Sequence, residues 1–178
     1  MKKINLYLMS LCLLLGIGVK AQTTILSENF SSASGTTPPT GWVQNFISGS
    51  TSNTWFFNNP GGRTLTSPIS SPAAVFDSDY LGYYAYFHNV ALESPSMNTT
   101  GKTVVRLKFD HYFYRTYNSF DSVAVEVYNG STWNYVWSSR STSTISGNID
   151  LDISAHAANK SSTKVRFRFV GDYSWYWI

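Results

Sequence analysis

The sequence has little cysteine and little charge. Its single cysteine, Cys12, lies in an apolar stretch near the N-terminus, and charged residues make up only 13% of the chain. One cysteine allows no intramolecular disulfide and no zinc-type cysteine spacing. His88, His111 and His156 are far apart in sequence and lack the His-Glu-x-x-His spacing, and no Gly-x-Ser-x-Gly motif occurs. The sequence therefore contains no motif for a zinc hydrolase or a serine hydrolase.

The first residues are typical of a secretory signal peptide. A short positive segment precedes the apolar run Ile4–Val19, and the chain then reaches a cleavage pattern that ends at Ala21. The run is slightly short for a retained membrane helix. Cys12 lies inside it behind a leucine, not behind the small residue that a lipoprotein signal needs. We expect a signal peptide over residues 1–21 and an exported domain over residues 22–178, secreted or at the cell surface, without membrane insertion after cleavage.

Removal of the signal changes the net charge. The chain has 13 basic and 10 acidic residues, which gives a formal net charge of +3. Lys2, Lys3 and Lys20 belong to the signal, so the exported domain is close to neutral. A nucleic-acid partner is not expected, because such partners require a basic surface. About 157 residues remain, and this length fits one domain with a substantial core.

Periodicity and composition predict an all-β fold. Aromatic residues make up 16% of the chain, and apolar and polar residues alternate with a period of two in several segments, as in strands with one buried face. The clearest alternation occurs in Thr103–Phe113, Asp121–Tyr128, Asn148–Ile153 and Lys164–Val170. Shorter strand candidates are Ile25–Phe30 as the opening strand, Thr54–Phe57, Ala73–Phe76, Tyr83–His88 and Val90–Glu93, and Ser154–Asn159 is predicted as a helical turn. These elements favour an antiparallel β-sandwich.

The last segment, Ser174–Ile178, is apolar on both faces. Trp175 and Trp177 point to one side of an extended strand, and Tyr176 and Ile178 to the other. Such a strand is expected to be covered on both sides, either at a central position or against the Ile25–Phe30 segment. We also expect the natural chain to continue past this strand into further domains.

Several short motifs follow one another in a fixed order along the chain. They are Glu28–Phe30, Pro39–Trp42, Trp55, Ala73–Asp79, Leu92–Pro95, Val105–Tyr112, Asp121–Val127, Trp133, Ile149–Ser154, Val165–Phe169 and Trp175–Ile178. This order resembles the bacterial choice-of-anchor and cleaved-adhesin domains, which are similar to MAM domains and to the adhesin modules attached to gingipain-type proteases. The resemblance implies a jelly-roll β-sandwich that is not catalytic, that binds glycans, matrix proteins or other surface components, and that in some members contains structural calcium. Members usually continue past the final Trp-x-Ile with acidic residues, which this chain lacks.

Two candidate sites contain carboxylates. Asp77 and Asp79 lie in a turn, where carboxylate and carbonyl oxygens together suit calcium, and the resemblance implies Glu28 as a third ligand; the alternative is an Asx-turn stabilised by its own backbone. Asp150 and Asp152 share one strand face, which would suit a glycoside hydrolase. We instead expect them to pair with the basic face formed by Lys164, Arg166 and Arg168.

Aromatic clusters suggest a ligand-binding surface. Exposed tyrosines provide large contact area at low entropic cost, although most aromatic residues are needed in the core of a domain without disulfides. The candidates are Tyr83, Tyr84, Tyr86, Tyr114 and Tyr117. The sequence thus favours a non-catalytic adhesion or carbohydrate-binding module with a glycan or extracellular protein as ligand. The alternatives are a jelly-roll glycoside hydrolase or accessory domain of a secreted hydrolase, and a purely structural module.

Overall fold

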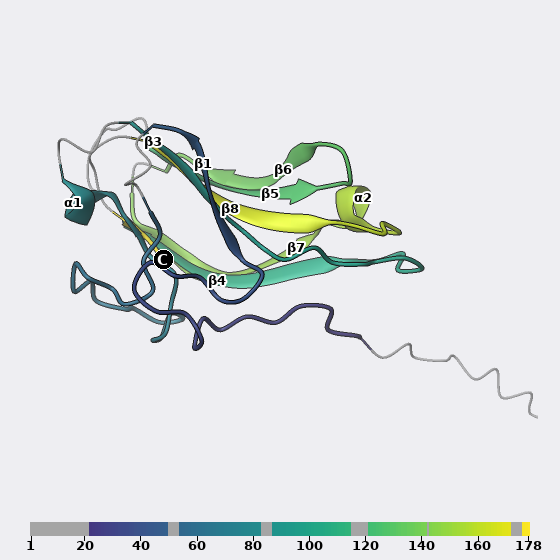
Figure 1. Cartoon of the computed structure of the whole chain (residues 1–178), viewed down its shortest axis with the longest axis horizontal. Helices are drawn as coiled ribbons and strands as arrows, with labels where there is room; N and C mark the ends of the chain where they lie inside the picture. The colour runs from purple at the N-terminus through teal and green to yellow at the C-terminus, as the bar shows by residue number, and fades with distance from the viewer. Residues whose placement is uncertain (1–21, 50–53, 83–86, 115–120, 142, 172–175) are drawn as a thin grey trace, which may run out of the picture.

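The computed structural model describes residues 22–49, 54–82, 87–114, 121–141, 143–171 and 176–178. Within these ranges the regular structure is mostly β-strand (Figure 1). The strands are β1 (Val43–Ser48), β2 (Phe76–Asp77), β3 (His88–Glu93), β4 (Arg106–Tyr114), β5 (Ser122–Tyr128), β6 (Trp133–Ser139), β7 (Ile145–Asp152), β8 (Lys164–Gly171) and β9 (Tyr176–Trp177). The helices in the described residues are single turns, α1 (Ser78–Leu81) and α2 (Ser154–Ala157).

The strands form two antiparallel sheets that face each other. One sheet has five strands in the order β1-β3-β8-β5-β6, and the other has four in the order β2-β9-β4-β7. Every named strand pair is antiparallel, and Figure 1 shows the two layers one above the other. Sequence neighbours such as β4 and β5 lie in different sheets. This arrangement confirms the predicted jelly-roll β-sandwich.

Side-chain alternation explains which face of each strand is buried. In β4, Arg106, Lys108 and Asp110 are exposed, whereas His111 and Phe113 point inward and are buried, as the alternation of Thr103–Phe113 predicts. The core between the sheets is largely aromatic. Phe76 stacks on Phe169 with ring centroids 4.6 Å apart. Burial of each such ring contributes roughly 1.5–3 kcal/mol, and the described structure has this aromatic core in place of a disulfide.

The last strand lies at a central position in the four-stranded sheet. β9 pairs with β2 on one side and with β4 on the other, and Ile178 exchanges two backbone hydrogen bonds with Tyr112, both of 2.9 Å. Trp177 packs into the core 5.6 Å from Trp55. Tyr176 and Trp177 are both buried. The prediction of a centrally docked strand covered on both faces is confirmed for the described part, Tyr176–Ile178.

The predicted opening strand, Ile25–Phe30, is wrong. These residues form no strand, because the backbone turns: Phe30 has a φ of 60°, and the Glu28 carboxylate accepts hydrogen bonds from the backbone N–H groups of Asn29 and Phe30. Leu26 and Phe30 nevertheless pack against the core. The segment therefore covers the core without joining a sheet.

The strands differ from the predicted pattern in other places. β1 and β6 have no counterpart among the predicted strands. The predicted strand Thr54–Phe57 is reduced to one bridge between Phe56 and Val75. Ala73–Phe76 contributes only Phe76 to β2, and the predicted Val90–Glu93 is part of β3. In the described ranges, no helix is long and apolar enough to cross a bilayer.

Candidate functional site

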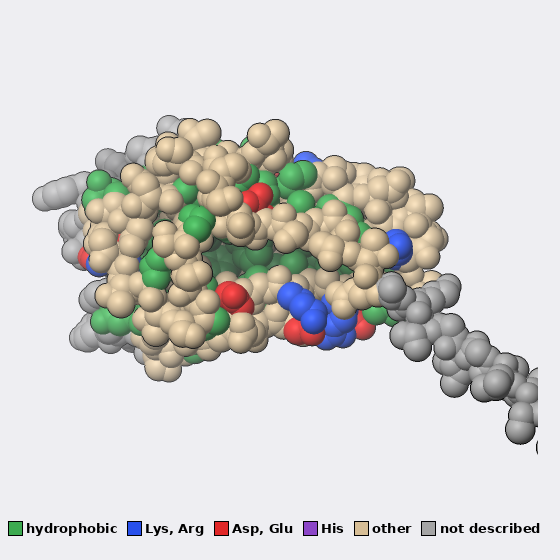
Figure 2. All heavy atoms as spheres, turned by 90° about the horizontal axis from the view of Figure 1, so that it is seen from below, with side chains coloured by type: hydrophobic (Ala, Val, Ile, Leu, Met, Phe, Trp, Pro, Cys, Tyr) green, Lys and Arg blue, Asp and Glu red, His purple; other side chains and the backbone are tan. Residues whose placement is uncertain are grey.

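Asp150 and Asp152 lie on the outer face of β7, but their partners are not those predicted. β7 pairs with β4, so the charged neighbours come from that strand. Arg106 Nε lies 2.7 Å from Asp150 Oδ1, and Lys108 Nζ lies 3.3 Å from Asp150 Oδ2. Figure 2 shows basic and acidic side chains side by side on the face seen from below, next to a hollow with hydrophobic side chains at its bottom. Cross-strand charge pairing is confirmed, but the prediction that it involves β8 is wrong.

Hydrogen bonds to Asp150 and to Asp152 favour the charged form of both carboxyl groups. The hydrogen bond from Arg106 lowers the pKa of Asp150 below its ordinary value. Hydrogen bonds from Ser154, including one of 2.9 Å from its backbone N–H, lower the pKa of Asp152. A glycosidase needs one carboxyl whose pKa is raised, so that it can donate a proton to the leaving group. Neither of these carboxyls has that property.

Asp77 and Asp79 bind an arginine. Arg63 Nε and Nη2 donate to the two oxygens of Asp77 at 2.7 and 2.8 Å, and Nη2 also donates to Asp79 at 2.7 Å. Asp77 is fully buried and caps α1 by accepting a 2.9 Å hydrogen bond from the backbone N–H of Tyr80. The hydrogen bond to Asp77 raises the pKa of Arg63. The guanidinium thus supplies the positive charge that this turn binds.

The predicted calcium ligands do not form one donor set in the described residues. Glu28 caps its own turn, and no three acidic, histidine or cysteine side chains of the described ranges come together in a way that could hold a metal. Asp77 and Asp79 are close to each other, but Arg63 lies between their oxygens. This donor arrangement does not fit a calcium ion at Glu28, Asp77 and Asp79. Calcium binding by the domain stays a prediction.

Of the predicted aromatic ligand residues, Tyr114 lies in a described part of the chain. It stacks on Tyr176 with centroids 5.2 Å apart and on Tyr112 at 6.3 Å, on the outer face of the four-stranded sheet. Arg63 lies 4.9 Å above the Tyr176 ring, and burial raises the pKa of Tyr176 to about 12. Leu65, Ile69 and Ala73 pack against the same cluster. Tyr83, Tyr84, Tyr86 and Tyr117 lie outside the described residues.

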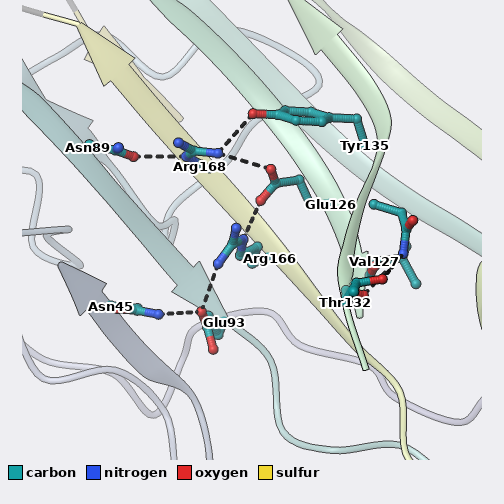
Figure 3. Close-up of polar contacts among 10 residues, drawn as sticks. Asn45, Asn89, Glu93, Glu126, Val127, Thr132, Tyr135, Arg166 and Arg168 are labelled. Carbon is teal, nitrogen blue, oxygen red and sulfur yellow. Dashed lines mark hydrogen bonds and ion pairs between the residues drawn. The ribbon is translucent and has the colours of Figure 1, made fainter. Parts of the chain in front are cut away.

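A connected cluster of buried ion pairs in the described structure has no counterpart among the sequence predictions. It lies on the outer face of the five-stranded sheet, where Glu93 of β3, Arg166 and Arg168 of β8 and Glu126 of β5 form a connected chain (Figure 3). Its neighbours are Asn45, Asn89, Trp133 and Tyr135. We call these eight residues the arginine–glutamate network.

Glu126 is the central acid of the network. Its side chain is 2% exposed, and its two oxygens bind the two arginines: Oε2 accepts from Arg166 Nε, and Oε1 accepts from Arg168 Nη1 at 3.1 Å. Arg166 also contacts Glu93 Oε1 at 3.4 Å, and its guanidinium lies 4.2 Å from the centre of the Trp133 ring. Buried charges of this kind are stable only when each is paired.

The exposed part of the network is Tyr135. This side chain on β6 is 62% exposed, yet its hydroxyl accepts a 2.8 Å hydrogen bond from Arg168 Nη1. Arg168 is held in turn by Asn89, which accepts from its Nε at 2.8 Å, and by Glu126. Figure 3 shows the Tyr135 hydroxyl directed at Arg168. An aromatic ring is therefore presented to solvent in a fixed position.

The network could have been found only in part from the sequence. The alternation in β5 and β8 places Glu126, Arg166 and Arg168 on the polar face, which is correct. The same pattern predicts that this face is solvated, whereas Glu126 and Arg166 are buried. The useful signal was the presence of acidic residues at the outward positions of two strands, β3 and β5, that could flank the basic positions of β8.

Comparison with known proteins gives results for structure only. No protein-family model matches the sequence, and no curated protein matches it. The K3 cleaved adhesin domain of Lys-gingipain from Porphyromonas gingivalis W83 is similar in structure, with a TM-score of 0.61 and 18% identity over 86% of this chain and 91% of that one. The K1 domain of the same protein gives 0.60 and 17% identity, over 87% and 94%. The chain has the cleaved adhesin fold.

A carbohydrate-binding module also matches this chain, at lower structural similarity. TmCBM61, solved in complex with β-1,4-galactotriose, covers 85% of this chain at 13% identity, with a TM-score of 0.47. That similarity is too distant to carry an argument about function. The low identity to the K1 and K3 domains establishes the fold alone, so function has to be argued from the described residues.

Proposed function

We propose that this domain is a non-catalytic, exported binding module that recognises a glycan on the outer face of the five-stranded sheet, around Tyr135 and Arg168. One observation carries the proposal. Tyr135 exposes most of its ring while Arg168 holds its hydroxyl. Immobilising a side chain on binding costs conformational entropy, up to about 0.5–1.5 kcal/mol for a rotamer-rich one and less for a tyrosine. A ring that is fixed before binding avoids this cost.

The surroundings of Tyr135 support a polar, planar ligand. A sugar ring presents C–H groups to an aromatic face and hydroxyls to nearby polar groups. Asn45 donates from Nδ2 to Glu93, whereas Asn89 accepts from Arg168 at Oδ1 and donates from Nδ2 to Ser48 Oγ. Arg168 remains 17% exposed. Asn side chains both donate and accept, which matches the double character of hydroxyl groups.

The experiment is glycan-array binding by purified residues 22–178, followed by calorimetric titration with the best ligand. Tyr135→Ala should weaken binding at least about tenfold, equivalent to about 1.4 kcal/mol. Tyr135→Phe keeps the ring and tests the contribution of the hydroxyl. Tyr80→Ala is the matched control, because Tyr80 is also exposed, at 51%, but lies on α1. Equal affinities of the Tyr135→Ala variant and the unmodified domain would refute this site.

A further inference from the structure

The antiparallel register arranges the outward side chains of β5, β6 and β8 in rows across the sheet. Tyr135 is in register with Glu126. The next row along the same strands consists of Arg168, Ala124 and Ser138. Ala124 and Ser138 are too small to cover the neighbouring Tyr135 ring, which is 62% exposed. A ligand can therefore lie against Tyr135 and beside Arg168 at the same time.

Arg168 has hydrogen-bond donors that the described structure does not use. Its Nε donates to Asn89, and its Nη1 donates to Glu126 and to Tyr135 (Figure 3). The two N–H groups of Nη2 have no partner among the described residues, and the side chain remains 17% exposed. The Tyr135 hydroxyl accepts from Arg168, so its own O–H can still donate. Arg168 and Tyr135 therefore offer donors to a ligand that carries acceptors.

The acids of this face are already paired with arginine. Glu126 binds Arg166 and Arg168, and Glu93 contacts Arg166 at 3.4 Å. β8 directs a third cation outward, because Lys164 lies two residues before Arg166 in the same strand. Lys164 has no ion pair within the part of the chain that the structure describes. Three cations against two acids leave this face with one positive charge in excess.

We propose that the glycan bound at this face contains uronic acids: one sugar ring lies against Tyr135, and its carboxylate accepts hydrogen bonds from Arg168 Nη2 and the Tyr135 hydroxyl. This inference rests on the glycan site proposed above and names its ligand class. A uronic acid carries its carboxylate directly on the sugar ring. The charged group therefore stays at the edge of a ring that is stacked on an aromatic side chain. Hydrogen bonds between a guanidinium and a carboxylate are charge-assisted and stronger than those to neutral hydroxyls.

The excess charge extends the preference to neighbouring sugars of the same chain. Lys164 is in register with Tyr128, whose ring lies 5.4 Å from that of Trp133, so it lies on the other side of Tyr135 from the Ser138 row. It attracts carboxylates of further uronic acids through solvent. This attraction is screened by salt over roughly 8–10 Å at physiological ionic strength. Binding of a uronic-acid glycan is therefore expected to weaken as salt is added, and binding of a neutral glycan is not.

The test is calorimetric titration of residues 22–178 with hexasaccharides of glucuronate, galacturonate and mannuronate. Each is compared with the neutral hexasaccharide obtained by reducing its carboxylates to alcohols, which keeps the rings and linkages. We expect at least one uronate hexasaccharide to bind saturably and at least about tenfold more tightly than its reduced counterpart at low ionic strength. The proposal is overturned if none of the uronate hexasaccharides binds, or if both members of every pair bind with equal affinity.

Lysine variants test whether the charge of this face contributes. Lys164→Gln should weaken binding of the uronate hexasaccharide about threefold, as expected for an exposed charge. Lys108→Gln is the matched control, because it removes the same charge from β4 in the other sheet, and it should leave the affinity unchanged. Equal affinities of the two lysine variants would refute a contribution of this face and with it the proposal.

The glycan site and its preference for uronic acids fail in different ways. If reduced and uronate hexasaccharides bind equally and Tyr135→Ala abolishes both, the glycan site stands and the preference is wrong. If a uronate hexasaccharide binds preferentially but Tyr135→Ala and Lys164→Gln leave its affinity unchanged, the ligand binds elsewhere and both proposals are wrong.

Discussion

Replacement of Glu126 by alanine should destabilise the domain strongly. The side chain is 2% exposed, and it is bonded to both Arg166 and Arg168. Its removal leaves Arg166, itself only 10% exposed, with one carboxylate contact, of 3.4 Å to Glu93, besides the Trp133 ring. Breaking a buried ion pair by removing one partner typically costs about 3–5 kcal/mol, because the remaining charge is left desolvated. We expect a loss in this range for the free energy of unfolding.

The assay is urea denaturation at neutral pH, with a thermal melt as a second measure. For a domain of this size, 1 kcal/mol shifts the thermal midpoint by roughly 2–4 °C, so Glu126→Ala should melt about 6–20 °C lower. Glu126→Leu combined with Arg166→Met removes the central pair and should recover part of the loss, since apolar replacement of a buried pair is often neutral. Arg168 and Glu93, which are 17% and 11% exposed, keep their charges without those partners.

An exposed pair gives the matched control. Asp150 bonds to Arg106 and Lys108 at comparable distances, but its side chain is 44% exposed. Asp150→Ala should therefore change stability little, because solvent screens an exposed ion pair. The reasoning is refuted if Glu126→Ala costs no more than Asp150→Ala, because burial would then contribute nothing to the difference.

The remaining predictions concern metal, pH and catalysis. Calcium bound by Asp77 and Asp79 would have to displace Arg63, so calcium should raise the thermal midpoint of Arg63→Ala more than that of the unmodified domain; identical melts with calcium and with chelator would contradict a site there. Tyr176, whose pKa is raised to about 12, keeps its proton in the fold while the unfolded chain loses it above about pH 10. Stability should consequently fall as pH rises between about 10 and 12, and Tyr176→Phe should flatten that decline in the urea midpoint. Purified domain should release no reducing sugar from common polysaccharides, and activity that Asp150→Asn or Asp152→Asn abolishes without unfolding would show a catalytic site.

The fold was more predictable than the site, because the alternation of apolar and polar residues identifies each strand and its buried face separately. The inward position of His111 follows from the sequence pattern around it, and it is 3% exposed with a pKa lowered by burial. β6 was not predicted, because a register shift between Val125 and Glu126 accompanies its pairing and its sequence shows no steady alternation. β1 also shows no steady alternation. It contains Gln44, whose side-chain amide bonds to Thr36 and Trp55, beside apolar residues.

The partners of the charged side chains depend on which strands are neighbours in a sheet. The alternation of apolar and polar residues along one strand does not reveal its neighbours. Asp150 was assigned to the basic face of β8, whereas β7 lies next to β4 in the other sheet. The same missing strand order concealed the arginine–glutamate network, since Glu93 and Glu126 flank Arg166 only when β3, β8 and β5 are adjacent. Arg63 gave no sequence signal as the partner of Asp77, 14 residues away.

The most direct test of the central claim is chemical-shift mapping of the ¹⁵N-labelled domain titrated with its best glycan. The account predicts that the largest shifts occur at amides of β5, β6 and β8 around Tyr135 and Arg168, and that Tyr135→Ala abolishes them. Shifts concentrated instead on the outer face of the four-stranded sheet, around Tyr112 and Tyr114, would contradict the proposed binding surface.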